Sequence, residues 1–274
     1  MFTALKKFLL DPHPLRTLTL GTARRLGVGN FDFKFYNGLH ERPSYAHILV
    51  EGALLAKSLG LKKVSAIEFG VAGGNGLLAM ERLAAQVEQR HGVQFEIYGF
   101  DTGQGLPPPV DYRDLPYHWQ EGFFAMDVQA LRAKLQRAKL VMGDVRETAK
   151  TFFAEHQPAP IAAISHDFDY YSSTMAALQM FKADPKYFLP RVHCYFDDTI
   201  GSRTELYNDY IGQLGAIADY NRDYPQQKIC RPEYMQVQFP PAPWHRQIFV
   251  HHDFAHPDYC TFVGRHNQQL AIPA

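Results

Sequence analysis

Cysteine is scarce in this sequence, and its formal charge is balanced. The 274 residues include only three cysteines, Cys194, Cys230 and Cys260, which are far apart and form no CxxC pair. This pattern argues against a disulfide framework and favours a reduced compartment, the cytoplasm. Lysine plus arginine and aspartate plus glutamate both total 28. The net charge therefore gives no reason to expect nucleic acid or an anionic membrane as a partner.

The chain also lacks a long apolar run at its start. Residues 1–14 carry Lys6 and Lys7 inside a short apolar stretch that ends at Asp11 and Pro12. This stretch is too short and too interrupted for a transmembrane helix, and it lacks a signal-peptide cleavage pattern. We therefore expect a surface or subunit-contact helix here, which is compatible with a homodimer, and no membrane partner.

Apolar residues, by contrast, are plentiful. They make up 46% of the sequence and aromatic residues 14%, which is enough to bury a sizeable core. In the middle of the chain, short β-rich runs alternate with helical patterns about five times. This alternation predicts an α/β fold with a Rossmann-like, doubly wound and mostly parallel sheet. The expected parallel strands cover residues 64–67, 94–100, 140–142, 161–166 and 191–196.

The two ends of the chain are expected to differ from this core. Residues 1–60 are predicted as an N-terminal helical extension or lid, and residues 61–274 as the α/β domain. Within the extension, Ser44 is the expected N-cap of a helix that runs to Leu59. Near the C-terminus we expect a helix over 205–220, followed by an antiparallel sheet edge. The strands of that edge are predicted at 234–239, 246–251 and 259–263.

The most informative stretch runs from Val64 to Met80. An apolar strand ends at Glu68, and a helical pattern continues from Leu77 to about Gln89. Between them lie glycines at positions 70, 73, 74 and 76. A strand, a glycine-rich turn and a helix in this order bring backbone N–H groups and a positive helix end close to a ligand. We therefore expect this turn to border a cofactor.

Acidic residues end the expected parallel strands. They are Glu68, Asp101, Asp144, Asp167 with Asp169, and Asp197 with Asp198. In a doubly wound sheet the carboxyl ends of the strands lie along one edge, and ligands bind there. Carboxylates that are distant in sequence should therefore converge on one crevice. At the end of the second strand, Asp101 occupies the position where this architecture binds a ribose hydroxyl.

Asp169, Asp197 and Asp198 should lie on adjacent strand ends. Carboxylates so close together repel one another and resist ionising unless a cation neutralises them. Oxygen ligands favour Mg²⁺ or a similar divalent ion over zinc, and such an ion can lower the pKa of a substrate hydroxyl. In the alternative interpretation, Asp197 and Asp198 cap the next helix and Asp169 binds backbone amides of its own loop.

Four ordered motifs within residues 40–215 together resemble a known family. They are the segments 68–74 (EFGVAGG), 99–107 (GFDTGQGLP), 167–174 (DFDYYSST) and 196–198 (FDD). They resemble the macrocin O-methyltransferase (TylF/MycF-type) family, class I enzymes that use S-adenosylmethionine to methylate sugar hydroxyls of natural products. The resemblance implies an S-adenosylmethionine-dependent O-methyltransferase with a small-molecule hydroxyl acceptor and assistance from Mg²⁺ or another divalent cation.

The resemblance also implies roles for single residues around the cofactor. Glu68, Gly70 and Gly74 would surround the methionine and ribose part of S-adenosylmethionine. Asp101 would bind the ribose hydroxyls. Asp144, together with its neighbours in sequence, would lie near the adenine.

At the acceptor end, the resemblance implies that Asp169, Asp197 and Asp198 match the metal-binding carboxylates. Asp169 would also be the catalytic base near the accepting hydroxyl. The chain departs from the family at Ala72 and Gly73, where the family usually has a bulky and a basic residue. The identity of the acceptor is therefore left open.

Two other functions are compatible with a sheet of this kind. One is an NAD(P)-dependent oxidoreductase, although the glycine spacing does not match GxGxxG and no Tyr-xxx-Lys pair stands out. The other is a catalytically silent Rossmann-like binding protein. Outside the motifs, Tyr112, Tyr117 and Trp119 would form either an acceptor-binding wall or packing beneath a loop.

Overall fold

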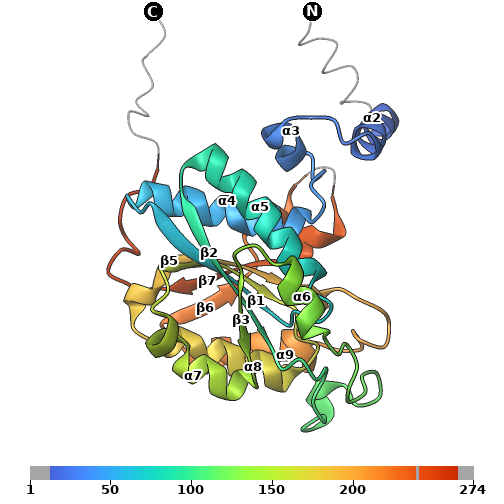
Figure 1. Cartoon of the computed structure of the whole chain (residues 1–274), viewed down its shortest axis with the longest axis vertical. Helices are drawn as coiled ribbons and strands as arrows, with labels where there is room; N and C mark the ends of the chain where they lie inside the picture. Colours follow the sequence, from blue (N-terminus) through green and yellow to red (C-terminus); the bar gives the residue numbers. More distant parts are fainter. Residues whose placement is uncertain (1–12, 239–240, 265–274) are drawn as a thin grey trace, which may run out of the picture.

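The structure is a computed structural model in which residues 13–238 and 241–264 are described. They form a seven-stranded sheet with the strand order β3-β2-β1-β4-β5-β7-β6 (Figure 1). Strands β1 to β5 pair in parallel, and β7 and β6 extend the sheet by antiparallel pairing. The predicted Rossmann-like, mostly parallel sheet with an antiparallel C-terminal edge is confirmed. The strands are β1 Lys63–Phe69, β2 Gln94–Asp101, β3 Lys139–Met142, β4 Ile161–His166, β5 Phe188–Phe196, β6 Gln227–Cys230 and β7 Ile248–Asp253.

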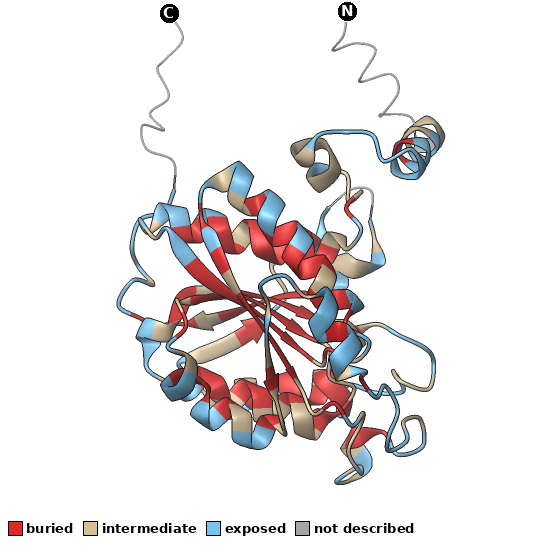
Figure 2. Ribbon diagram, viewed as in Figure 1, coloured by how far each residue is buried: buried red, intermediate tan, exposed pale blue. Residues whose placement is uncertain are grey.

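Helices cover both faces of the sheet. Helices α4 and α5 lie on one face, and α7, α8 and α9 lie on the other (Figure 1). Every residue of β4 is buried, as expected for a parallel strand between two helical layers. The buried apolar side chains form two clusters. Buried residues lie in the sheet and in the helices on both of its faces (Figure 2). The helices are α4 Pro43–Ser58, α5 Asn75–His91, α7 Val145–His156, α8 Tyr171–Leu178 and α9 Gly212–Asp223.

Helix α4 belongs to the packed core. The side chains of Ile48 and Leu49 have no exposed surface. The helix begins at Pro43, whose missing N–H suits the first helical position, and Arg42 occupies the cap position. The predicted N-cap at Ser44 is therefore wrong.

Shorter elements connect these layers or precede them. Helices α2 and α3 lie before α4, beyond the layer that α4 and α5 form (Figure 1). The predicted division at residue 60 stays a prediction, and residues 1–12 of the predicted N-terminal helix lie outside the described residues. Among those described, no helix has the length and apolar character that crossing a membrane requires. The short elements are α2 His13–Arg25, α3 Phe31–Tyr36, α6 Val128–Lys134, α10 Glu233–Gln236 and the 3-10 turns Tyr112–Asp114, Gln179–Lys182, Pro185–Tyr187, Asp197–Thr199 and Pro243–Gln247.

The predicted helix over 205–220 is wrong at its start, because α9 begins only at Gly212. The residues before it form turns. In one of them, the side chain of Asn208 accepts a hydrogen bond from the amide of Tyr210 at 2.9 Å. Bonds of this kind compete with helix formation.

Two of the three predicted C-terminal strands are also wrong. The segment 234–239 begins inside helix α10, with its last residue outside the described part, and the segment 259–263 forms turns. The segment 246–251 does contain most of a strand, β7. Strand β6, a four-residue run that was not predicted, pairs with the outer edge of β7 and leaves no free edge there for 234–239.

Candidate functional site

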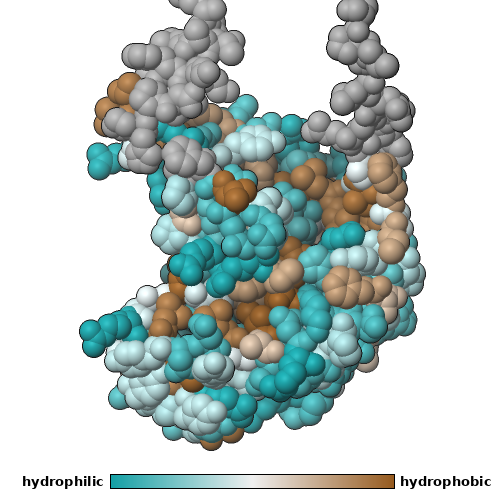
Figure 3. Space-filling model, turned by 180° about the vertical axis from the view of Figure 1, so that it is seen from behind, coloured by the Kyte–Doolittle hydropathy of each residue, from teal (hydrophilic) through white to brown (hydrophobic). Residues whose placement is uncertain are grey.

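A cavity of about 610 Å³ opens where β1, β2, β4 and β5 end. In the space-filling view the molecule is hollowed between its two helical layers, with hydrophobic residues inside the hollow (Figure 3). The predicted convergence of carboxylates that are distant in sequence on one crevice is confirmed. Among the predicted site residues, those that line the cavity are Glu68, Gly70, Asp101, Asp144, Asp169, Asp197 and Asp198.

Close contacts shape the glycine turn between β1 and α5. Gly70 has a φ of 77°, and a Cβ there would lie 2.0 Å from the carbonyl oxygen of Asp167. At Gly76, in the first turn of α5, a Cβ would lie 1.9 Å from Oε1 of Glu68. Gly74 is the N-cap of α5 and lies outside the cavity lining. The first two positions therefore exclude side chains, so that backbone itself borders the cavity.

Asp101, the last residue of β2, holds this turn in place. Its Oδ2 accepts hydrogen bonds from the amides of Val71 at 2.9 Å and Ala72 at 2.8 Å. Its Oδ1 accepts one from the amide of Gly103 at 2.6 Å. Both carboxylate oxygens thus accept hydrogen bonds from backbone amides beside the cavity. Contact of Asp101 with a ribose stays a prediction.

Glu68 is buried under the turn and lines the cavity. Its Oε1 accepts a hydrogen bond from the Tyr45 hydroxyl at 2.6 Å, and the Ser165 hydroxyl donates to that of Tyr45 at 2.9 Å. Its Oε2 has no hydrogen-bond partner among the described residues. Burial raises the pKa of Glu68 to about 8, although the bond from Tyr45 and the charge of Arg42 lower it. An unpartnered carboxylate oxygen fits a positively charged ligand group, such as the ammonium group of S-adenosylmethionine.

Asp144 lies after β3, where it caps helix α7. Its side chain accepts a hydrogen bond from the amide of Arg146 at 2.8 Å and forms an ion pair with the guanidinium of the same residue. Hydrogen bonding from Arg146 lowers the pKa of Asp144. Both residues line the same cavity as Asp101. The predicted position of Asp144 near an adenine stays a prediction.

Four aspartates gather where β4 and β5 end. Asp167, Asp169, Asp197 and Asp198 all line the cavity. Burial, reinforced by neighbouring carboxylates, raises the pKa of Asp169 to about 7 and also raises the pKa of Asp167 and Asp198. The Oδ2 atom of Asp198 is buried without a hydrogen-bond partner among the described residues. Such a cluster favours a cation in its neighbourhood.

These carboxylates do not form a finished metal site. In the part of the chain that the structure describes, no group of three or more His, Cys, Asp or Glu side chains is placed to hold a metal ion. The alternative in which Asp197 and Asp198 cap the next helix is wrong, because α9 has Ile211 as its N-cap and no side-chain cap. Instead, Asp197 accepts hydrogen bonds from the Tyr195 hydroxyl and the Gln247 side-chain amide.

The aromatic segment between β2 and α6 provides another wall. Trp119 and Phe124 line the cavity, with their ring centroids 5.6 Å apart. Tyr112 and Tyr117 are exposed and lie outside the cavity lining. Of the three residues considered for an acceptor-binding wall, only Trp119 therefore faces the cavity, and Phe124 was not predicted.

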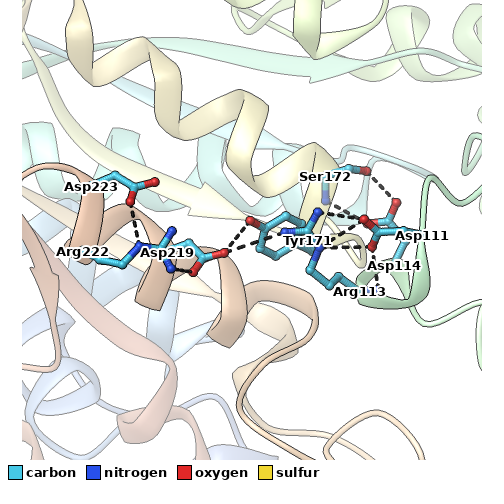
Figure 4. Close-up of polar contacts among 8 residues, drawn as sticks. All are labelled: Asp111, Arg113, Asp114, Tyr171, Ser172, Asp219, Arg222 and Asp223. Atoms are coloured by element: carbon cyan, nitrogen blue, oxygen red, sulfur yellow. Dashed lines mark hydrogen bonds and ion pairs between the residues drawn. The ribbon is translucent and has the colours of Figure 1, made fainter.

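A buried aspartate fastens this segment to helix α8 (Figure 4). Asp114 is 0% exposed. Its Oδ2 accepts hydrogen bonds from the Val110 amide and the Ser172 hydroxyl, and its Oδ1 accepts one from the Ser172 amide, each at 2.8 Å. Beside it, the Arg113 guanidinium lies 4.1 Å from the centroid of the Tyr171 ring. Sequence reasoning missed Asp114, because its partner Ser172 is 58 residues away.

Solved structures with a similar fold exist, whereas no family model and no curated protein matches this chain. Against CalS11, a calicheamicin methyltransferase, the TM-score is 0.51, with 21% identity over 86% of this chain and 92% of that one. The chain has a methyltransferase fold. Against the O-methyltransferase NovP, this methyltransferase fold gives a TM-score of 0.52, with 14% identity over 76% of this chain and 79% of that one.

Proposed function

We propose that this protein is an S-adenosylmethionine-dependent O-methyltransferase. The observation that carries the proposal is a single cavity lined by two unlike groups of residues. One group is the glycine turn with the unpartnered oxygen of Glu68, and the other is Asp169 with its neighbouring aspartates. The first group suits a positively charged cofactor, and the second suits a hydroxyl group that must lose a proton. The cavity volume of about 610 Å³ is ample for small ligands.

When bound, S-adenosylmethionine supplies an electrophilic methyl group. Glu68 would hold the ammonium group of the cofactor, and the backbone of the glycine turn would border its ribose. Asp169 would accept the proton of the acceptor hydroxyl. Its pKa, raised to about 7 by burial, suits a base that works near neutral pH. The remaining work of the protein is to align the two reactants, and no covalent enzyme intermediate is required.

The proposal includes a divalent cation, Mg²⁺ or a similar ion. Asp169, Asp197 and Asp198 would hold it, and its charge would favour ionisation of the acceptor hydroxyl. In support, burial and neighbouring carboxylates raise the pKa of Asp169 and Asp198. The buried Oδ2 of Asp198 also has no hydrogen-bond partner among the described residues. A cation would relieve the repulsion within this cluster.

The acceptor we propose is a small molecule with a hydroxyl group, on a sugar or another natural product. Two proteins of similar fold, CalS11 and NovP, are a calicheamicin methyltransferase and an O-methyltransferase. Trp119 and Phe124 would offer such an acceptor an apolar wall. We further propose that the enzyme works in the cytoplasm and has neither nucleic acid nor a membrane as a partner. The proposal is compatible with a homodimer.

Calorimetric titration with S-adenosylmethionine and S-adenosylhomocysteine tests the cofactor. We expect both to bind at micromolar concentration. Binding of NAD in their place, or no binding of either at millimolar concentration, would overturn the proposal.

Thermal unfolding with and without Mg²⁺ tests the cation. Mg²⁺ should raise the unfolding temperature of the wild type but not that of Asp198→Asn. The control is Asp184→Asn, whose carboxylate pairs with Lys186 at the surface and should not alter the response. An equal effect of Mg²⁺ on wild type and Asp198→Asn would remove the cation from the proposal.

A further inference from the structure

Arg42 brings a positive charge to the cavity from outside the glycine turn. It precedes helix α4, and its guanidinium lies 5.1 Å from the centroid of the Tyr45 ring. It lines the cavity together with Glu68 and Asp167. Burial opposes its charge, but Tyr45, Glu68 and Asp167 together raise its pKa. The Arg42 guanidinium is therefore held in its charged form at the cavity wall, under the influence of Glu68 and Asp167.

This guanidinium lacks a polar partner among the described residues. Within the described part of the chain, the guanidinium stacks on the Tyr45 ring and forms no side-chain hydrogen bond or ion pair. The other guanidinium that lines the cavity, Arg146, is paired with Asp144. A half-buried arginine has five N–H donors to satisfy, so an unpaired one at a cavity wall points to an anionic group of the ligand.

Glu68 shows the complementary feature. Its Oε2 is buried without a hydrogen-bond partner among the described residues, whereas Oε1 is bound by the Tyr45 hydroxyl. Tyr45 thus contacts both residues, with its ring against Arg42 and its hydroxyl on Glu68. Arg42 and Glu68 do not form an ion pair with each other. On either side of Tyr45, the cavity therefore offers a positive group without a polar partner and a carboxyl oxygen without a hydrogen-bond partner.

A ligand that satisfies both groups carries a carboxylate and an ammonium group close together. An α-amino acid has this arrangement, and S-adenosylmethionine ends in one. We propose that Arg42 binds the carboxylate at the amino-acid end of S-adenosylmethionine, opposite the ammonium group held by Glu68. This inference rests on the proposed function and assigns a binding residue outside the four sequence motifs.

Three ligands distinguish binding of the cofactor carboxylate by Arg42 from a general electrostatic effect of its charge. S-adenosylmethionine has the whole amino-acid end, decarboxylated S-adenosylmethionine keeps only the ammonium group, and 5′-methylthioadenosine lacks both. Calorimetry on the wild type should show a preference of roughly 10- to 100-fold for S-adenosylmethionine over its decarboxylated form, as expected for a charge-assisted hydrogen bond. In Arg42→Gln this preference should disappear, while the affinity for 5′-methylthioadenosine stays unchanged.

Two further variants complete the design. Glu68→Gln should weaken the binding of S-adenosylmethionine and its decarboxylated form alike, because both carry the ammonium group. Arg90→Gln is the matched control, since Arg90 pairs with Asp32 at the surface, and it should keep the wild-type preference.

The outcomes are distinguishable. If the wild type binds none of the three ligands, the proposed function itself fails. If Arg42→Gln weakens all three equally, Arg42 only balances the charge of nearby acids and the inference is overturned. If Arg42→Gln does not fold, the calorimetry on the wild type still tests the inference. A wild-type preference below about threefold for S-adenosylmethionine over its decarboxylated form would contradict it.

Discussion

The carboxylate of Asp101 holds the amide of Ala72, with 2.8 Å between Oδ2 and the amide nitrogen. Ala72 has a φ of 46°, a left-handed conformation that residues with a Cβ rarely adopt. The same carboxylate also binds the amides of Val71 and Gly103. We expected Asp101 to contact a ribose. In the structure, its carboxylate stabilises the strained turn that borders the cavity.

Replacing Asp101 should consequently weaken cofactor binding through the turn. Asp101→Asn turns an amide donor toward backbone amides, so we expect a loss of about tenfold in affinity for S-adenosylhomocysteine. Asp101→Ala removes every acceptor and should lose more. Calorimetric titration measures both, with the surface variant Asp184→Asn as the control. Wild-type affinity in Asp101→Asn would contradict this role.

The sequence predicted the central sheet well because its signals are local. Strand β4 is a continuous apolar run, and both of its faces are buried as expected. Glu68 and Asp101 end their strands, so the topology alone brings them to one edge. The fold and the meeting of the carboxylates thus required no knowledge of individual side-chain contacts.

Features decided by tertiary pairing escaped prediction. Strand β6 has only four residues, two of them polar, and its place in the sheet comes from its pairing with β7. Arg42 and Asp114 lie outside the regular pattern. Asp114 matters through Ser172, which is 58 residues away, and Arg42 through the buried acids Glu68 and Asp167, which only the fold brings near it. The unpartnered oxygens of Glu68 and Asp198 could not be predicted either, since only a packed structure shows which oxygens remain without a hydrogen-bond partner.

A methyl group at Gly76 should destabilise the protein although Gly76 lies in a helix. Elsewhere in a helix, alanine is favoured over glycine by about 1 kcal/mol. Here its Cβ would lie 1.9 Å from Oε1 of Glu68 and 2.9 Å from the Tyr45 hydroxyl oxygen. Glu68 is buried and cannot move aside without losing its bond to Tyr45. We expect Gly76→Ala to lower the free energy of unfolding by about 1 to 3 kcal/mol in chemical denaturation.

Gly73→Ala is the matched control for that change. A Cβ at Gly73 would have no neighbour within 4 Å. Its effect on the free energy of unfolding should stay within about 0.5 kcal/mol. Equal stability of the two variants would show that Glu68 is less firmly held than its contacts indicate.

The titration of Glu68 should appear in the pH dependence of stability. Its pKa in the folded protein is about 8, above the ordinary value of 4.5, mainly because of burial. The folded state therefore binds this proton more tightly, and the associated stability is lost as pH rises from the unfolded pKa toward the folded one. Relative to Glu68→Gln, the wild type should lose up to about 1.4 kcal/mol per pH unit between about pH 5 and 7.5.

Denaturation curves at several pH values check this prediction. The control is Glu147→Gln, because Glu147 is exposed and pairs with Lys150 at the surface. Its stability should run parallel to that of the wild type over the same range. Parallel profiles for the wild type and Glu68→Gln would instead mean that Glu68 stays ionised in the folded protein.

Asp114 should matter for the acceptor side of the cavity and not for the cofactor side. It accepts hydrogen bonds from Val110 and Ser172, and it is completely buried. Asp114→Asn places an amide donor against these donors, so we expect a loss of about 2 to 4 kcal/mol in the free energy of unfolding. Glu147→Gln, as an exposed acid-to-amide change, should stay within about 0.5 kcal/mol.

Ligand titration separates the local effect of Asp114→Asn from general unfolding. The segment that Asp114 fastens carries Trp119 and Phe124, which line the cavity, whereas the glycine turn is held by Asp101. At a temperature where the variant is folded, its affinity for S-adenosylhomocysteine should therefore equal that of the wild type. Once an acceptor is identified, its KM should rise in the variant. An equal loss of cofactor affinity would show that the two walls of the cavity are not independent.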